Sequence, residues 1–144
     1  MSEASTSRAM WKNVRASLVI GGLQAVCGLL LGFAKRQGLI DIETTLRGAM
    51  VIVGVGLAAA GNRIPKSSDG PSPSTLKLAV LRQSVMRTAG WSLMLGGLAF
   101  AGLWAFAPLA VAQVAATIAL GGSLAVMSIF VTTWIYAYHR SPTR

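Results

Sequence analysis

Few side chains in this chain of 144 residues could perform chemistry, and they are widely scattered. The acids, the only thiol and the only imidazole are Glu3, Asp41, Glu43, Asp69, Cys27 and His139. General acid–base catalysis and metal binding both require such groups to gather, and a structural zinc site takes about four ligands. No recognisable ligand spacing or phosphate-binding motif is present. We therefore predict no catalytic, cofactor-binding or metal site, and a protein that is not an enzyme.

The elements that would have to position these groups are hydrophobic. From Thr88 to Tyr138 the chain runs 51 residues without a charged side chain, and Pro108 divides this stretch. A bilayer core about 30 Å thick needs about 20 apolar residues per helix, and a proline inside a helix removes a hydrogen bond. The stretch therefore predicts two antiparallel membrane helices joined by a tight turn at Ala107-Pro108.

Two further hydrophobic segments precede this hairpin. The first is uncharged from Ser17 to Ala34. The second is uncharged only from Gly48 to Asn62, so it must extend back past Arg47, whose side chain is expected to snorkel toward the headgroups. We predict an all-α, four-helix transmembrane bundle that forms a single integral membrane domain over residues 1–144, with spans at about 17–34, 42–62, 88–106 and 109–138.

The acids lie outside these spans or at their edges, which argues against a proton-coupled transporter. Small four-helix multidrug transporters depend on an acid inside the first helix, where this chain offers only Gln24. The amides Gln24 and Gln113 lie within predicted spans, and each is expected to hydrogen-bond to a neighbouring helix or to a backbone carbonyl. Whether the two amides pair with each other stays open.

Basic residues are divided unevenly between the two sides of the predicted bundle. With both termini cytoplasmic, ten of the 13 lysines and arginines lie inside and three lie outside, so we predict an N-in/C-in protein of the bacterial inner membrane. A net charge of +9 would indicate nucleic acid in a soluble protein. Here we expect anionic lipids as the partner, and no nucleic acid.

Residues 63–87 connect the second and third spans and are expected to form a cytoplasmic loop. Ser67–Ser74 is predicted to be a flexible linker, and Thr75–Arg87 mixes aliphatic with basic residues. The second part fits a short amphipathic helix on the membrane surface, and it fits equally well the start of a long third helix. Contacts to lipid headgroups or to a protein partner are expected from Arg63, Lys77 and Arg82.

Every predicted span carries two small residues four positions apart, a spacing that lets membrane helices approach closely. These pairs are Gly28 and Gly32, Gly56 and Ala60, Gly97 and Ala101, and Gly121 and Ala125. Some of these spacings will arise by chance in a chain rich in glycine and alanine. They favour packing within the bundle, against another membrane protein, or in a homo-oligomer.

The second span ends in the segment Gly61–Lys66, which reads GNRIPK. Gly61 would let the helix end, Asn62 tolerates a left-handed conformation, and Pro65 prevents continuation. Lys66 would complement the negative end of the helix. A simple helix stop accounts for every residue of the segment.

The same segment also resembles the signature of SdpI-type membrane proteins, a family of bacterial toxin-immunity and signal-transducing proteins. The arginine and glycine that open the third span, and the two tyrosines and arginine that close the fourth, resemble further family motifs in the same order. The family-like residues are Gly61, Asn62, Pro65, Lys66, Arg87, Gly90, Tyr136, Tyr138 and Arg140. The loop after Lys66 departs from the family pattern, as does Met86, which stands where a histidine is typical.

The resemblance implies a non-enzymatic inner-membrane protein that acts in immunity or signal transduction through its basic cytoplasmic loop. The alternative is a structural accessory subunit of a larger membrane complex, which the small size and the small residues on every span also favour. A small transporter is a distant third hypothesis, because the spans lack a charged residue in their interior.

Overall fold

The computed structural model describes residues 3–66 and 76–140, and these residues are almost entirely helical. The elements are α1 (Glu3–Arg36), α2 (Ile42–Arg63), a short 3₁₀ helix η1 (Ile64–Lys66), α3 (Leu76–Phe106) and α4 (Leu109–Arg140). All four α-helices are long and apolar enough to cross a bilayer. The predicted all-α, four-helix fold is confirmed.

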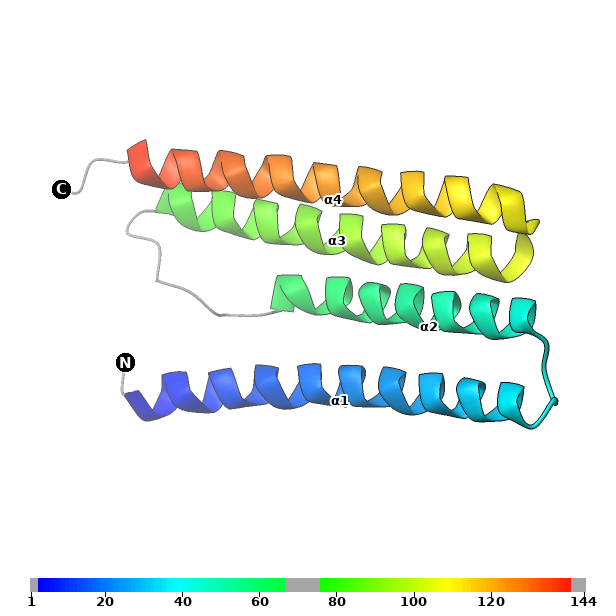
Figure 1. Ribbon diagram of the computed structural model, residues 1–144. Coiled ribbons are helices and arrows are strands. Elements are labelled where there is room, and N and C mark those ends of the chain that lie inside the picture. Colours follow the sequence, from blue (N-terminus) through cyan, green and yellow to red (C-terminus); the bar gives the residue numbers. More distant parts are fainter. Residues whose placement is uncertain (1–2, 67–75, 141–144) are drawn as a thin grey trace.

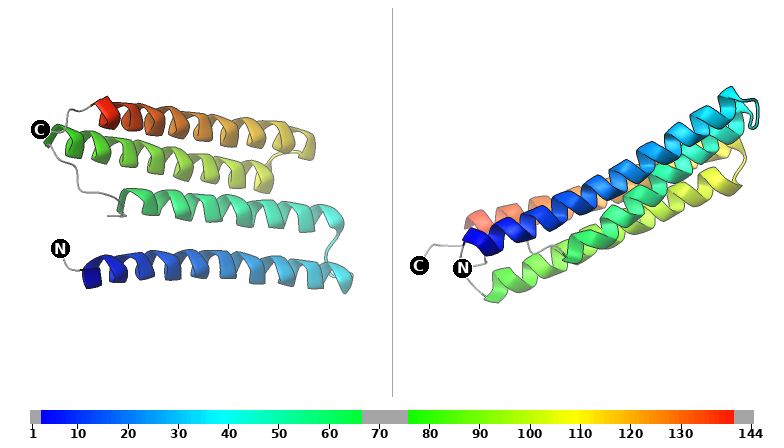
Figure 2. Two further views of the ribbon diagram at one scale, coloured as in Figure 1. Left: turned by 60° about the vertical axis from the view of Figure 1, so that its left-hand side comes forward. Right: turned by 90° about the horizontal axis from the view of Figure 1, so that it is seen from below.

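The four helices stand side by side in a row, and successive helices run antiparallel (Figure 1). Among the described residues, α1 contacts α2, α2 contacts α3, and α3 contacts α4, with no contact between α1 and α4. A view turned by 60° shows the same order of neighbours (Figure 2, left). The bundle is therefore open, with α1 and α4 as its edge helices.

The two ends of the row differ in how the chain connects the helices. At one end, here called the hairpin end, short connections join α1 to α2 and α3 to α4 (Figure 1). The opposite end, here called the terminal end, carries the start of α1, the end of α2, the start of α3 and the end of α4. At the terminal end α2 stops well short of the other three helices (Figure 1).

Both connections at the hairpin end follow from local sequence. α1 ends in a Schellman arrangement, in which the N–H of Leu39 donates to Ala34 at 3.0 Å and the N–H of Gly38 donates to Lys35 at 3.0 Å. Gly38 has a φ of 70°, a conformation that costs a side-chain-bearing residue energy. Between α3 and α4 only Ala107 and Pro108 intervene, as the proline predicted.

α2 packs against α3 through residues with little or no side chain. Gly54, Ala58 and Gly61 form the buried face of α2. A Cβ placed on Gly54 would lie 2.7 Å from the carbonyl oxygen of Gly97, and one on Gly61 would lie 2.5 Å from the backbone nitrogen of Met94. The two backbones therefore touch directly, and no side chain larger than hydrogen fits at Gly54 or Gly61.

The predicted small-residue pairs fare unequally. Gly97 and Ala101 do form a helix contact, and their partner on α2 is Gly54. Gly28, Gly32 and Gly121 have open space where a side chain would lie, and Gly56 faces Gln24 of α1. On α2 the contact is made by Gly54 and Ala58, which have the same spacing of four as the predicted pair Gly56 and Ala60. The spacing marks one face of a helix but does not specify which such face points to a neighbour.

α3 runs without a break from Leu76 to Phe106, so the segment before Arg87 is the start of a long third helix and not a separate surface helix. Leu76 and Val80 are exposed, whereas Val85 and Ala89 are buried. The first turns of α3 therefore extend beyond the packed part of the row. The predicted linker Ser67–Ser74 lies outside the described residues.

α2 does end within the Gly61–Lys66 segment, but the prediction that Gly61 and a left-handed Asn62 end it is wrong. The helix continues through Arg63, the N–H of Ile64 bonds to the carbonyl of Gly61, and Ile64 keeps right-handed helical angles of φ −51° and ψ −48°. Among the described residues only Gly38 has a positive φ. Gly61 serves the close approach of α3 instead, because its missing side chain leaves room for the backbone of Gly90 and Met94.

Candidate functional site

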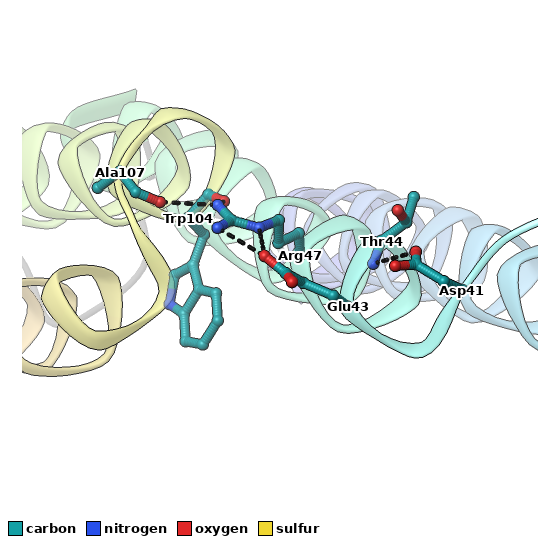
Figure 3. A network of polar contacts seen from close by, with 6 residues as sticks. All are labelled: Asp41, Glu43, Thr44, Arg47, Trp104 and Ala107. Atoms are coloured by element: carbon teal, nitrogen blue, oxygen red, sulfur yellow. Dashed lines mark hydrogen bonds and ion pairs between the residues drawn. The ribbon is translucent and has the colours of Figure 1, made fainter.

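At the hairpin end, the guanidinium of Arg47 links α2 to the end of α3 (Figure 3). Its Nη1 donates to the carbonyls of Trp104, at 3.0 Å, and Ala107, at 2.8 Å. Its Nε and Nη2 both lie 2.9 Å from Oε1 of Glu43, one turn earlier on α2. The sequence predicted only that Arg47 reaches toward the headgroups; the structure adds that its donors are directed to protein carbonyls and to Glu43.

Pro108 explains why Arg47 is needed. In a continuing helix the Trp104 carbonyl would accept a hydrogen bond from the residue four positions later, which here is Pro108 and has no N–H. Arg47 supplies the missing donor. Arginine also favours the negative end of a helix dipole, so the interaction stabilises the end of α3 electrostatically.

Asp41 caps the start of α2. Its Oδ1 accepts a hydrogen bond of 2.9 Å from the backbone N–H of Thr44, as expected of an N-cap residue (Figure 3). Hydrogen bonding from Thr44, through its side chain and its backbone N–H, lowers the pKa of the Asp41 carboxyl below its ordinary value of 3.8. The charged carboxylate is thus the form that the folded protein prefers.

This lowered pKa predicts an acid-dependent contribution of Asp41 to stability. A carboxyl with a depressed folded-state pKa stabilises the fold above its unfolded pKa, near 3.8, and that stabilisation is lost as the pH falls through the folded pKa. D41A should therefore be less stable than wild type at pH 7, and the difference should shrink at pH values below 3.8. D41N, which keeps the cap, should lose much less at pH 7. Thermal unfolding in detergent across this pH range provides the measurement, and a D41A deficit that is independent of pH would contradict the prediction.

The two amides predicted to join helices lie in different environments. Nε2 of Gln24 on α1 donates to the carbonyl of Ile52 on α2 at 3.0 Å, and the amide rests against Gly56. Gln113 is exposed on α4, and its backbone carbonyl accepts from the hydroxyl of Thr117 at 2.7 Å. The amides do not meet, because the described parts of α1 and α4 make no contact.

Gln24 and Gln113 form a matched pair for testing the α1–α2 contact. Q24L removes a hydrogen bond between helices in an apolar environment, and we expect it to lower the free energy of unfolding by about 1 kcal/mol. Q113L alters an exposed position and should leave stability unchanged or slightly raised in detergent. Unfolding in mixed micelles, followed by circular dichroism, measures both. Equal effects of the two substitutions would show that the Gln24 contact contributes nothing specific.

A pocket of about 330 Å³ lies at the terminal end, between the end of α2 and the facing part of α3. Five of the family-like residues line it: Gly61, Asn62, Pro65, Arg87 and Gly90. They come from two segments separated by more than 20 positions in the sequence. Gln83, Trp91 and Met94 of α3 are the other described residues that line it. The pocket therefore brings together two of the three sequence motifs.

The floor of this terminal-end pocket is a close backbone contact. A Cβ on Gly90 would lie 2.6 Å from Cδ of Pro65 and 2.7 Å from the carbonyl oxygen of Gly61. Gly61 and Gly90 thus let η1 and α3 meet, and Pro65 packs into the space that a side chain on Gly90 would take. Arg87 and Asn62 are exposed at the rim, where they can reach a ligand.

Of the other predicted site residues, those with described side chains do not line this pocket. Arg63 and Arg82 are half-buried near it, on α2 and α3, and Tyr136 is exposed on α4. The side chains of Lys66, Lys77, Tyr138 and Arg140 lie outside the described part of the structure, although the helices that carry them are described.

Sequence reasoning missed Gln83, Trp91 and Met94 as members of the site. With Arg87 and Gly90 they recur at intervals of three, four or seven positions, which places them on one face of α3. That periodicity was the available signal once the third helix was known to begin before Arg87. Among residues 3–66 and 76–140, no three potential metal ligands gather at one place.

Fold and sites together define a small multi-pass membrane protein with four membrane-spanning helices. Large apolar side chains are exposed along both edge helices, including Leu29 and Phe33 on α1 and Ile118 and Ile129 on α4. Lipid is the medium that covers such surfaces without cost. No protein-family model, no curated protein and no solved structure matches the chain.

Proposed function

We propose that this is a non-enzymatic, SdpI-like protein of the bacterial inner membrane that protects the cell against a membrane-active agent or transmits its presence. The observation that supports this is the convergence of five family-like residues on the pocket at the terminal end. Residues that served only to stop α2 and start α3 would not need to share one surface. In this proposal the terminal end is the working face of the protein.

The charge distribution supports a cytoplasmic position for that face. Basic residues predominate on the helix segments at the terminal end, with Arg15, Arg63, Arg82 and Arg87 among the described side chains. Short segments rich in lysine and arginine stay on the cytoplasmic side of bacterial membranes. A reporter fused after Arg144 that fluoresces only in the cytoplasm should be active, and a reporter active only outside should be silent. The reverse pattern would refute the proposed orientation.

Survival of cells under challenge is the direct test of the immunity role. Cells that express the chain should tolerate membrane-active peptides better than cells with an empty vector, and N62L, which obstructs the pocket rim, should abolish this advantage. Q113L is the matched control, because it also places leucine at an exposed amide position but lies on α4, away from the pocket. Equal sensitivity with and without the chain, across several peptide classes, would argue decisively against immunity.

A second function, as an accessory subunit of a larger membrane complex, is favoured by a different observation. The outward face of α4 carries small and polar residues at intervals of three or four positions, and all are exposed: Gln113, Thr117, Gly121, Ala125 and Ser128. Such faces pack closely against other membrane helices. Purification in mild detergent should then yield a stable complex with a second protein. Migration alone, or only with itself, would exclude this role.

A further inference from the structure

The terminal-end pocket has the features of a binding site for a phosphate group. Arg87 provides a full positive charge at its rim, and Asn62 and Gln83 provide amide N–H donors. All three side chains are exposed, and among the described residues none of them has a hydrogen-bond or ion-pair partner. We infer that this pocket binds the phosphate of one anionic phospholipid molecule.

The depth of Arg87 in the bilayer suits a lipid phosphate. Phe106 ends α3 at the hairpin end, and Arg87 lies 19 positions before it, or about 28 Å along the helix at 1.5 Å per residue. The hydrocarbon core is about 30 Å thick, so Arg87 lies at its boundary when Phe106 lies at the opposite boundary. Phospholipid phosphates occupy the headgroup layer just beyond that boundary.

The polarity of the lining changes along α3 as the polarity of a phospholipid changes along its length. Gln83 and Arg87 lie nearest the headgroup layer at the terminal end, Trp91 lies one turn deeper, and Met94 lies nearest the hydrocarbon core. A tryptophan side chain favours the level of the glycerol backbone, and a methionine side chain suits an acyl chain. A soluble phosphate ion would leave this deeper, apolar part of the pocket without an occupant.

The charge requirement favours an anionic lipid over a zwitterionic one. The pocket adjoins the carbonyl end of α2, which carries partial negative charge and repels an anion. Arg87 must therefore supply most of the attraction, and a lipid with its own choline cation would compete with Arg87 for the phosphate. Binding here is independent of the proposed immunity role, because it concerns an affinity that is measured on the purified protein alone.

Native mass spectrometry of the full-length protein tests the inference. The chain, released from detergent with added phosphatidylglycerol, should retain one tightly bound lipid and should prefer it to phosphatidylcholine. R87Q should weaken this binding by about tenfold, the value of one charge-assisted hydrogen bond. The matched control is R15Q, which removes the same charge from an exposed arginine of α1 at the terminal end but outside the pocket. Circular dichroism verifies that both variants remain helical, and N62A provides a second, milder change at the rim.

Each alternative result would overturn the inference. Equal losses of lipid binding in R87Q and R15Q would mean that binding depends only on the net charge of the protein. Retention of phosphatidylcholine as strongly as phosphatidylglycerol would exclude the anionic preference. Displacement of the lipid by inorganic phosphate or glycerol phosphate at equal concentration would assign the pocket to a soluble phosphate compound instead. None of these outcomes bears on cell survival under peptide challenge, so the two proposals fail separately.

Discussion

Replacing Gly97 by leucine is expected to separate α2 from α3 and to abolish the native fold. A Cβ on Gly97 would lie 2.6 Å from the backbone nitrogen of Ala58 and 2.7 Å from the carbonyl oxygen of Gly54. Both obstacles are backbone atoms of α2, which cannot rotate away as a flexible side chain would. We expect G97L to cost about 3 kcal/mol or more of unfolding free energy, the upper range for overpacked cores.

The same helix offers a matched control for this prediction. Gly102 lies five positions further along α3, and a Cβ placed on it would meet nothing within 4 Å. G102L should therefore change stability little, although it adds the same side chain to the same helix. Steric trapping or denaturant titration in mixed micelles measures both variants. If G97L and G102L were equally tolerated, the direct backbone contact between α2 and α3 would be refuted.

Replacing Arg47 by methionine is expected to have the second largest effect. Methionine keeps most of the length of the side chain but leaves the carbonyls of Trp104 and Ala107 without their donor and Glu43 without its partner. A hydrogen bond to a charged group contributes about 1.5–3 kcal/mol. Both carbonyls share the single Nη1 of Arg47, whose side chain is 24% exposed, so we expect R47M to cost about 2–3 kcal/mol, the value of one such bond. The turn at Pro108 should also become more accessible to proteases.

Three further variants separate the contributions at this site. R47K keeps the charge but lacks the forked geometry that reaches two carbonyls and one carboxylate together, so it should lose part of the stability. E43Q should cost less than R47M, because the Glu43 side chain is 49% exposed and its ion pair is weakened by solvent. R36M, at an exposed position in the last turn of α1, controls for the removal of a basic residue at the hairpin end. Losses as large in R36M as in R47M would rule out a specific role for Arg47.

The contacts that Arg47 and Gln24 make join neighbouring helices and involve no reactive group. Arg47 and Gln24 satisfy backbone carbonyls of neighbouring helices, at 2.8 Å to Ala107 and at 3.0 Å to Ile52. In lipid no water is available to bond such carbonyls, so a polar side chain from the next helix is worth more than it would be at an aqueous surface. Arg47 and Gln24 thus serve assembly of the row.

The long apolar segments and the turn residues between them determined the helical, membrane-spanning class by themselves. A stretch of 51 residues without charge is too long and too apolar for a soluble domain of this size. Pro108 interrupts the helix, so the stretch forms two helices joined by a turn. The unequal number of basic residues at the two ends of the row could be predicted as well, because these residues lie just outside the spans and their positions depend only on the local sequence.

Which faces of the helices meet was decided by the tertiary structure alone. The same spacing of two small residues occurs on α1 and on α3. On α1, Gly28 and Gly32 face open space, whereas on α3, Gly97 touches α2. Apolar residues lie on every face of each span, so hydrophobic periodicity does not show which face of a helix in lipid meets a neighbouring helix. For the same reason only the structure could show that Gly61, read in the sequence as a helix stop, is a contact point, and that Arg47 bonds to α3. The pocket at the terminal end likewise exists only because α2 and α3 approach closely enough to bring Asn62 and Arg87 to one surface.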